Sequence, residues 1–354
     1  MNHPEFHRSE YSACSSIQNE AHLNDLLSTP TDAAVNAMAR LKGDILLLGA
    51  GGKMGPTFAT MARRADAAAG VSRRITAVSR FSDESLPNQL RESGIEVIRG
   101  DLMDEAFLAS LPDVENVVSM VGMKFGTGSA AAMTWAMNTY LPSLICRKFR
   151  SSRIMAFSTG NVYPLVSLES GGSQESDVLC PVGEYGMSAL GRERIYEHFS
   201  RTLRIPSTII RLNYAVEMRY GVLVDIAQQV LSGSEIDLSM SAANVIWQGD
   251  ANALSLAALA DATTPPFVLN VAGEELFRVQ DVAERFAERF GVVARFRGSP
   301  GTTSLLNNGN LARKQYGGSR VSLDQLIAWT ADWLQRGGRL LSKPTQFQNR
   351  DGRF

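Results

Sequence analysis

Three glycines are spaced so that the loop they form could bind a diphosphate. The chain has Gly49, Gly52 and Gly55 between an apolar run, residues 45–48, and an Ala-rich segment, residues 56–69. In a strand–loop–helix unit such glycines allow a tight turn, close approach of a diphosphate and close packing of helix on strand. The N–H groups and dipole at the start of the helix also favour phosphate oxygens. We therefore predict a dinucleotide-binding loop formed by Gly49, Gly52, Lys53, Met54 and Gly55.

The end of the second predicted strand bears on which dinucleotide would bind. An acidic side chain there accepts hydrogen bonds from the ribose 2′-hydroxyl of NAD, whereas an arginine accommodates the 2′-phosphate of NADP. The strand ends in Val78-Ser79-Arg80, with no carboxylate in the expected place. We therefore predict NADP as the preferred cofactor and NAD as the alternative. Ser79 and Arg80 would be phosphate ligands, and Lys53 would add positive charge.

The elements that must position these residues alternate regularly along the chain. Short apolar runs at 75–78, 96–98, 116–120, 152–158 and 207–212 alternate with helix-like segments at 86–93, 105–111, 130–148 and 185–203. Strands that alternate with helices indicate βαβ units and a parallel sheet. The predicted fold class is α/β, a Rossmann-type doubly wound parallel sheet with a smaller C-terminal substrate lobe.

The same pattern divides the chain into four parts. Residues 1–42 are predicted to form an N-terminal extension with one helix, over 21–41, that packs on the domain surface or on a partner chain. Residues 43–213 form the dinucleotide-binding domain, with later contributions from about 241–272. Residues 214–340 form mainly the smaller lobe, and residues 341–354 form a short charged tail to which the sequence assigns no role.

Composition excludes several classes of function. The 354 residues carry a formal net charge of -1, so no charge excess points to nucleic acid or to a membrane surface, and a small-molecule substrate is expected. The three cysteines, Cys14, Cys146 and Cys180, suit neither a disulfide framework nor a metal pair. Three of the four histidines precede residue 43, so no metal site is predicted. The first residues lack a signal-peptide pattern, and we expect a cytoplasmic protein.

Several motifs together resemble the extended short-chain dehydrogenase/reductase family, the NAD(P)-dependent epimerases and dehydratases. The resemblance covers roughly residues 43–250 and continues faintly to about 333. Besides the glycine loop, it rests on Gly100-Asp101-Leu102, Ser119-Met120-Val121-Gly122, Asn138 and Phe157-Ser158-Thr159-Gly160-Asn161-Val162-Tyr163. It also rests on a tyrosine motif that begins at Tyr185.

The resemblance implies a role for each of these residues. Asp101 and Leu102 would lie at the adenine, while Met120, Val121 and Gly122 would lie beside the nicotinamide ribose, with Asn138 in the long helix nearby. Thr159, with Ser158 beside it, would position a substrate oxygen, and Tyr185 would exchange a proton with it. The family implies hydride transfer on a small substrate such as a nucleotide sugar. It also implies a homodimer formed through the helices 130–148 and 185–203.

The tyrosine motif departs from the family pattern in one residue. The family has YxxxK, whereas this chain has Tyr185-Gly186-Met187-Ser188-Ala189. The family lysine binds the nicotinamide ribose, and its charge makes the phenol a better acid–base group. Three hypotheses follow: an active enzyme helped by another cation, with Arg192 as the nearest candidate; a dinucleotide-binding sensor or structural partner without hydride chemistry; or an active site in which other residues replace the motif.

One further loop follows the fourth predicted strand. Residues 124–128, Lys-Phe-Gly-Thr-Gly, are polar and rich in glycine. At the carboxyl end of a parallel sheet such a loop either faces the substrate or is an ordinary connection.

Overall fold

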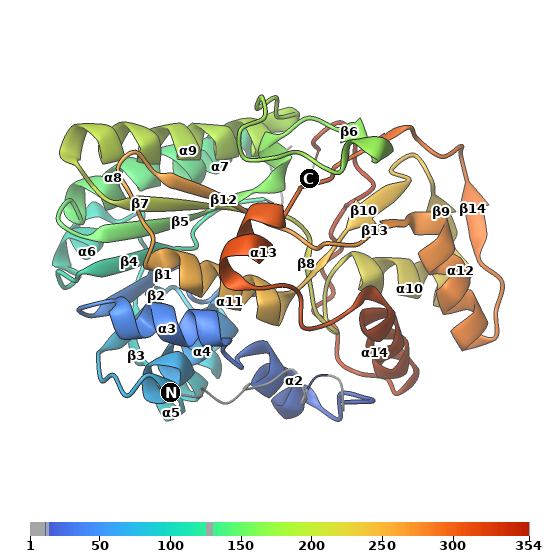
Figure 1. The fold of residues 1–354 in the computed structure, drawn as a ribbon, viewed down its shortest axis with the longest axis horizontal. Helices are drawn as coiled ribbons and strands as arrows, with labels where there is room; N and C mark the ends of the chain where they lie inside the picture. The colour runs from blue at the N-terminus through green and yellow to red at the C-terminus, as the bar shows by residue number, and fades with distance from the viewer. Residues whose placement is uncertain (1–10, 12–13, 125–129, 354) are drawn as a thin grey trace.

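A seven-stranded parallel sheet forms the centre of the molecule (Figure 1). The computed structural model describes residues 11, 14–124 and 130–353. The strands lie in the order β12-β7-β5-β4-β1-β2-β3, and every neighbouring pair is parallel. Their bounds are Ile45–Leu48 (β1), Ile75–Ser79 (β2), Glu96–Arg99 (β3), Asn116–Ser119 (β4), Arg153–Thr159 (β5), Ser207–Leu212 (β7) and Phe267–Val271 (β12). The predicted doubly wound sheet is therefore confirmed.

Helices cover both faces of this sheet, because its strands are apolar on both sides. One face packs against α3 (Asp32–Arg40), α4 (Gly55–Ala68) and α11 (Gln248–Leu259), with α5 (Leu86–Glu92) beside α4. The other face packs against α6 (Glu105–Ser110), α8 (Leu141–Lys148) and α9 (Gly183–Leu203). The order of strands reverses between β1 and β4, and ligands of open α/β sheets bind outside the carboxyl ends of the strands at such a point.

The long helix predicted over 130–148 is present, but its middle turn is wider than an α-helical turn. Between α7 (Ala131–Trp135) and α8 lies a π turn, η1 (Ala136–Tyr140), which contains the buried Asn138. Such π turns occur frequently at functional sites. This turn lies where the helix approaches the end of β4, because Asn138 accepts a hydrogen bond from the N–H of Met123.

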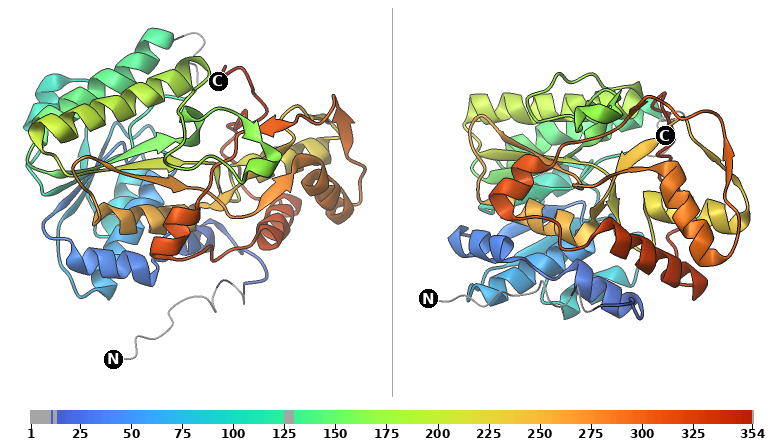
Figure 2. Two further views of the ribbon diagram at one scale, coloured as in Figure 1. Left: turned by 45° about the horizontal axis from the view of Figure 1, so that its top comes forward. Right: turned by 45° about the vertical axis from the view of Figure 1, so that its right-hand side comes forward.

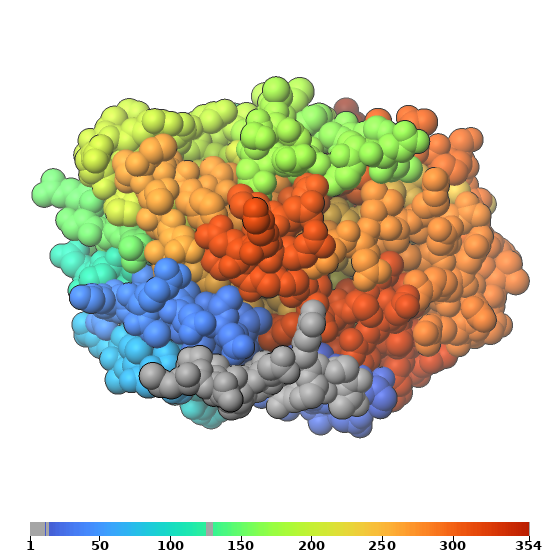
Figure 3. All heavy atoms as spheres, in the orientation of Figure 1, coloured from blue at the N-terminus to red at the C-terminus, as the bar shows by residue number. Residues whose placement is uncertain are grey.

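The smaller lobe has an apolar core of its own, built around α10 (Val222–Ser232), α12 (Val279–Phe290) and α14 (Leu323–Gln335). Figure 2 shows these helices beside the sheet layer, on the side of the strand carboxyl ends. The remaining short strands form two-stranded pairs, β10-β13, β11-β8, β14-β9 and β15-β6. Their bounds are Val166–Ser167 (β6), Ala215–Val216 (β8), Glu235–Asp237 (β9), Ala242–Asn244 (β10), Ile246–Trp247 (β11), Leu276–Arg278 (β13), Arg295–Arg297 (β14) and Thr303–Ser304 (β15), and the short helix α13 (Asn310–Tyr316) packs against β12. In Figure 3, α13 lies at the centre of the front face.

The described part of the N-terminal extension differs from the prediction, because residues 21–41 fall in two helices where one was expected. The helix α2 (Glu20–Leu27) ends before Pro30, which has no N–H to continue it, and α3 starts after Thr31, whose side chain accepts a hydrogen bond from the N–H of Ala34. The two helices have different partners. Leu23 of α2 belongs to the core of the smaller lobe, whereas α3 packs on α11 of the sheet layer.

The C-terminal tail, to which the sequence assigned no role, is packed into the molecule. Phe347 is 2% exposed and belongs to the core of the smaller lobe. Arg350 donates hydrogen bonds to the carbonyl oxygens of Ser239 and Thr303 at 2.8 and 2.7 Å. Gly352 packs against the carbonyl of Val182, just before α9 begins. Among the described residues, no helix is long and apolar enough to cross a membrane.

Candidate functional site

The glycine loop leaves an open space at the start of α4. Gly49 has a φ of +84°, and a Cβ there would lie 3.1 Å from the backbone nitrogen of Val121. A Cβ on Gly55 would lie 2.3 Å from the carbonyl oxygen of Ala50, so this glycine allows the helix to pack on the loop. Gly52 is exposed, and a Cβ there would meet only the Gly49 oxygen, at 3.5 Å.

The first turn of α4 also fits an anion. It contains no acidic residue, its N-cap residue Met54 makes no side-chain cap, and Pro56 has no N–H. The positive end of the helix dipole therefore has no side chain that neutralises it. Together with the exposed Gly52, this leaves the start of α4 accessible to an anion.

The residues predicted at the adenosine end lie together. The hydroxyl oxygen of Ser79 would be 2.6 Å from a Cβ on Gly51, so β2 ends directly beside the loop. The Arg80 guanidinium, whose side chain is 75% exposed, lies 3.8 Å from the carboxylate of Asp101. An exposed pair at this distance contributes little to stability, so Arg80 can turn to another anion at small cost. Leu102 is buried behind them.

Lys53 reaches toward the smaller lobe. Its ammonium donates a hydrogen bond to the carbonyl oxygen of Ala215 at 2.9 Å and lies 4.1 Å from the ring centroid of Tyr220. Burial lowers the pKa of Lys53 to about 7, although the carboxylate of Glu217 acts in the opposite direction. The structure therefore places this charge at the junction of the two lobes, whereas the sequence had assigned it to the 2′-phosphate of NADP.

At the end of β4, the predicted segment from Met120 to Gly122 continues into a turn that Asn138 holds. The side-chain oxygen of Asn138 accepts a hydrogen bond from the N–H of Met123 at 2.9 Å, and its amide donates to the Met123 carbonyl at 3.0 Å. The same amide donates to the hydroxyl of Ser188 on α9 at 2.9 Å. Asn138 therefore links the end of β4 to the helix that carries Tyr185.

Arg192 supplies a buried positive charge on this helix. Its side chain donates to the Phe157 carbonyl at 2.8 Å and to the side-chain oxygen of Asn138. A Cβ on Gly122 would lie 2.5 Å from its guanidinium, so Arg192 lies directly beneath the ends of β4 and β5. Desolvation lowers the pKa of Arg192, and interactions with Tyr185 and other groups oppose this change. Ala189, in contrast, is fully buried in a small apolar cluster with Val162 and Tyr163.

The two hydroxyls at the end of β5 have different partners. The Ser158 hydroxyl donates to the carboxylate of Glu193 at 2.5 Å, and Glu193 forms a buried ion pair with Arg211 at 2.8 Å. The Thr159 hydroxyl donates to the Asn161 side chain at 3.1 Å. Ser158 therefore belongs to a buried polar network, while Thr159 lies at the outer end of the strand.

Tyr185, in the first turn of α9, lies near the ammonium of Lys124. The sequence had indicated Lys124 only as part of the loop after the fourth strand. The Lys124 ammonium lies 5.9 Å from the Tyr185 ring centroid and donates to the Thr345 carbonyl at 3.1 Å. Burial lowers the pKa of Lys124 to about 8, opposed by the charge of Asp225. The rest of the predicted substrate-facing loop, residues 125–128, lies outside the part that the structure describes.

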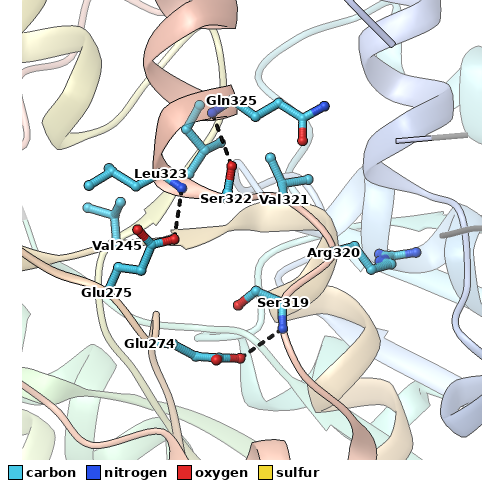
Figure 4. A pocket seen from close by; sticks show the side chains of 10 residues that line it. Val245, Glu274, Glu275, Ser319, Arg320, Val321, Ser322, Leu323 and Gln325 are labelled. Carbon is cyan, nitrogen blue, oxygen red and sulfur yellow. Dashed lines mark hydrogen bonds between the residues drawn. The ribbon is translucent and has the colours of Figure 1, made fainter. Parts of the chain in front are cut away.

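A cavity of about 310 Å³ lies elsewhere, between the residues that follow β12 and the start of α14 (Figure 4). Glu274 and Glu275 line it, but both accept hydrogen bonds from backbone N–H groups, those of Ser319 and Leu323. None of the predicted site residues lines this cavity. It is therefore separate from the candidate site.

The architecture is similar to that of nucleotide-sugar epimerases and dehydratases, some of them solved with NAD bound, which confirms the predicted resemblance at the level of the fold. UDP-glucuronic acid 4-epimerase from Bacillus cereus, in complex with NAD, is 18% identical; the match covers 83% of this chain and 99% of that chain, with a TM-score of 0.68. A dTDP-glucose 4,6-dehydratase from Streptomyces venezuelae with NAD bound is 17% identical, with coverages of 83% and 97% and a TM-score of 0.70. UDP-glucose 4-epimerase from Thermotoga maritima is 16% identical, with coverages of 83% and 99% and a TM-score of 0.68.

No family model matches the sequence, and neither does any curated protein. At these identities the structural similarity establishes the fold. The activity depends on the residues of the site, because one fold supports many different activities.

Proposed function

We propose that this chain is an NAD(P)-dependent oxidoreductase or epimerase of the extended short-chain dehydrogenase/reductase type. It would transfer hydride to or from a carbonyl or carbinol carbon of a small substrate, such as a nucleotide sugar. The main support for the proposal is the position of Arg192. Its guanidinium is buried on the same helix as Tyr185, beneath the ends of β4 and β5. It provides positive charge near the tyrosine although Ala189 stands at the lysine position of the family.

The residues near the strand ends would have different roles in the acid–base chemistry. Tyr185 would exchange a proton with the substrate oxygen, and Thr159 would position that oxygen. Ser158 would hold the end of β5 through Glu193 while its oxygen remains able to accept a hydrogen bond. Asn138 would fix the turn after β4, against which the substrate and the nicotinamide would lie.

The cofactor would bind along the carboxyl ends of β1, β2 and β4. Gly49, Gly52, Met54 and Gly55 would admit the diphosphate at the start of α4, because Gly52 is exposed and the helix has no side-chain cap. The adenosine would lie near Asp101 and Leu102, and the nicotinamide ribose near Met120, Val121 and Gly122. Bound NAD(P) would supply or accept the hydride. We propose NADP as the preferred form, because Ser79 and the exposed Arg80 stand at the end of β2.

Titration calorimetry tests this proposal. The purified protein, stripped of nucleotide, should bind NADP+ more tightly than NAD+, and Arg80→Ala should remove most of that preference while leaving NAD+ binding unchanged. Arg91→Ala, on the nearby helix α5, is the control for a lost surface charge. A protein that binds neither nucleotide would refute the proposal. With binding established, a panel of nucleotide sugars, including UDP-glucose and UDP-glucuronic acid, tests turnover in the wild type and in Tyr185→Phe.

The second candidate function is a dinucleotide-binding sensor or structural partner. The burial of Ala189 among apolar side chains favours it, because that site offers no place for the charge of the family lysine. Tight NADP+ binding without turnover on any tested sugar, and with no change of binding in Tyr185→Phe, would support this function. The third hypothesis, a rebuilt active site, is supported by the position of Lys124 beside Tyr185.

We also propose a homodimer in a reducing compartment, the cytoplasm. The helices implied in dimer contact carry the exposed apolar side chains of Met133, Tyr140 and Met187. Cys14, Cys146 and Cys180 all carry free thiols. Sedimentation analysis of the wild type and of Met187→Glu tests the dimer; a monomeric wild type would contradict it.

A further inference from the structure

A buried amide whose polar atoms have no partner lies beside the turn that follows β5. Asn307 is 1% exposed, and neither its side-chain oxygen nor its side-chain nitrogen forms a hydrogen bond. Among the buried asparagines and glutamines that the structure describes, Asn307 alone lacks a partner at both amide atoms. Unpaired buried polar atoms oppose folding, so such a group calls for a specific explanation, such as a functional role or a bound water.

The main chain of Asn307 lies at the junction of the two lobes. Asn244 of β10 donates a hydrogen bond to the Asn307 carbonyl at 2.7 Å and accepts one from its N–H at 3.4 Å. The neighbour of Asn244, Ala243, belongs to the core of the smaller lobe. From the central sheet, Asn270 of β12 donates to the carbonyl of Asn308 at 3.2 Å. The amide is therefore held from both lobes before a ligand binds, which lowers the entropic cost of binding.

The Asn307 amide lies against Gly160, the residue that follows Thr159 in the chain. A Cβ on Gly160 would lie 2.6 Å from the side-chain oxygen of Asn307 and 2.9 Å from its nitrogen, so the glycine leaves room for the amide. In the same turn, the Thr159 hydroxyl donates to the side chain of Asn161 at 3.1 Å. The end of β5 therefore brings together one hydroxyl and two amides, none of which carries a charge.

We propose that Asn307 binds a hydroxyl group of a sugar substrate beside Thr159. A hydroxyl both donates and accepts hydrogen bonds, so it can satisfy the oxygen and the nitrogen of the amide. A carboxylate or phosphate could pair only with the nitrogen and would leave the amide oxygen facing a negative charge. Thr159 and Asn307 are 7% and 1% exposed, and a hydrogen bond shielded from water in this way is stronger. The inference rests on the proposed function, because it takes the end of β5 as the place of the substrate.

The carboxamide of a nicotinamide ring is a second group that could satisfy both amide atoms. The topology favours the substrate. The nicotinamide ribose is proposed to bind at the end of β4, between β1 and β5, whereas Asn307 follows β15, which pairs with β6 outside the central sheet. Dinucleotide binding and sugar binding, measured in the same variant, separate the two sources.

Substitution of Asn307 by leucine tests whether the amide is unpaired in the free protein. Leucine has a similar branched outline but no polar atom. Without ligand, the Tm of Asn307→Leu should equal or exceed that of the wild type, because no hydrogen bond is lost. Asn244→Leu is the matched control, since its amide donates to the carbonyls of Gly273 and Asn307. That variant should have a Tm lower by at least about 2 °C.

Titration calorimetry then tests the ligand. The protein is saturated with the dinucleotide that it binds, and UDP-glucose and UDP-glucuronic acid are titrated into it. The wild type should bind at least one of these sugars, and Asn307→Leu should bind it about tenfold more weakly, the effect of losing one well-placed hydrogen bond. Its affinity for the dinucleotide should be unchanged.

Each other outcome overturns the proposal. A Tm of Asn307→Leu as low as that of Asn244→Leu would show that an internal water already satisfies the amide. Equal sugar affinity in Asn307→Leu and the wild type, or a wild type that binds neither sugar, would exclude the sugar hydroxyl. Weaker dinucleotide binding by Asn307→Leu would assign the amide to the nicotinamide carboxamide. If neither dinucleotide binds, the proposed function fails separately, and sugar titrations without dinucleotide decide the role of Asn307.

Discussion

Arg192 on α9 donates a hydrogen bond to the side-chain oxygen of Asn138, which lies in the π turn of the neighbouring helix. The same oxygen accepts the backbone N–H of Met123 at the end of β4. One asparagine therefore joins the buried charge of α9 to the strand end where the nicotinamide ribose is proposed to bind. Asn138 lies within η1 and is fully buried there.

Replacing Arg192 by methionine should weaken dinucleotide binding while leaving the fold intact. The methionine fills part of the space, but the Phe157 carbonyl and Asn138 lose a charged donor, which costs about 1–3 kcal/mol of stability. We expect the dissociation constant of NADP+ to rise about tenfold, the effect of losing about 1.4 kcal/mol of interaction. Calorimetry measures it, with Arg194→Met, an exposed arginine on the same helix, as the control. Equal affinities in the two variants would contradict the role of Arg192.

Substitution of Gly52 by valine should abolish dinucleotide binding without loss of stability. Its Cβ would meet only the Gly49 oxygen, at 3.5 Å, so the side chain projects into the space proposed for the diphosphate. Gly55→Val is the contrasting variant, because its Cβ would lie 2.3 Å from the Ala50 oxygen and the helix would have to move. Urea unfolding should separate the two, with a loss of about 2 kcal/mol or more only for Gly55→Val. Normal NADP+ binding by Gly52→Val would show that the cofactor site is misplaced.

The stability of the protein should depend on pH through Lys53. Its pKa is lowered to about 7 in the folded chain, while an unfolded lysine has a pKa of about 10.4. Between these values the unfolded state binds more protons, so the free energy of unfolding should increase with pH. Lys53→Met removes this dependence. The wild type should therefore gain stability relative to Lys53→Met from pH 7 to 9.5 in urea titrations.

The control for that experiment is Lys343→Met, which removes an exposed lysine of the tail. The groups that face Lys53 include Lys124, Glu217, Arg219, Tyr220 and Asp225. A slope of the same size in Lys53→Met would contradict the role of Lys53 and assign the dependence to other groups.

The buried pair of Glu193 and Arg211 should show strong coupling. Arg211→Met leaves the Glu193 carboxylate without its cation inside the protein, and losses of about 3–5 kcal/mol are typical when one partner of a buried pair is removed. Glu193→Gln combined with Arg211→Met should restore part of this loss, since no unpaired charge is left. A double-mutant cycle by urea unfolding measures the coupling. Additive losses would show that the two residues stabilise the fold independently.

The individual strands and the glycine loop could be predicted from local sequence, because each is formed by a short continuous segment of the chain. Ile45–Leu48 is apolar throughout, and the glycines that follow it lie within seven residues. Arg192 could be predicted as a candidate cation because helical spacing puts it on the same face of α9 as Tyr185. These features can be recognised from the spacing of residues within one segment, whatever distant residues pack against it.

Other features depend on contacts between distant parts of the chain. Lys124 and Thr345 lie 221 positions apart, and nothing near either residue indicates that they meet. The buried environment of Ala189 could not be predicted either, because it depends on how Tyr163 packs. Pro30 indicates the break between α2 and α3, because proline cannot donate a hydrogen bond within a helix. The apolar spacing continues across Pro30, however, and it led to the prediction of one helix.

The core of the smaller lobe contains residues from both ends of the chain, Tyr11, Ile17 and Leu23 at one end and Phe347 at the other. Phe347 follows the last strand of the sheet, β12, by more than 70 residues, so the ribosome synthesises the whole sheet before it adds Phe347. The sheet layer can therefore fold while the smaller lobe still lacks part of its interior. We expect nascent chains to hold a formed sheet and an incomplete lobe until Phe347 has left the ribosome, which makes that lobe the part most in need of chaperone protection.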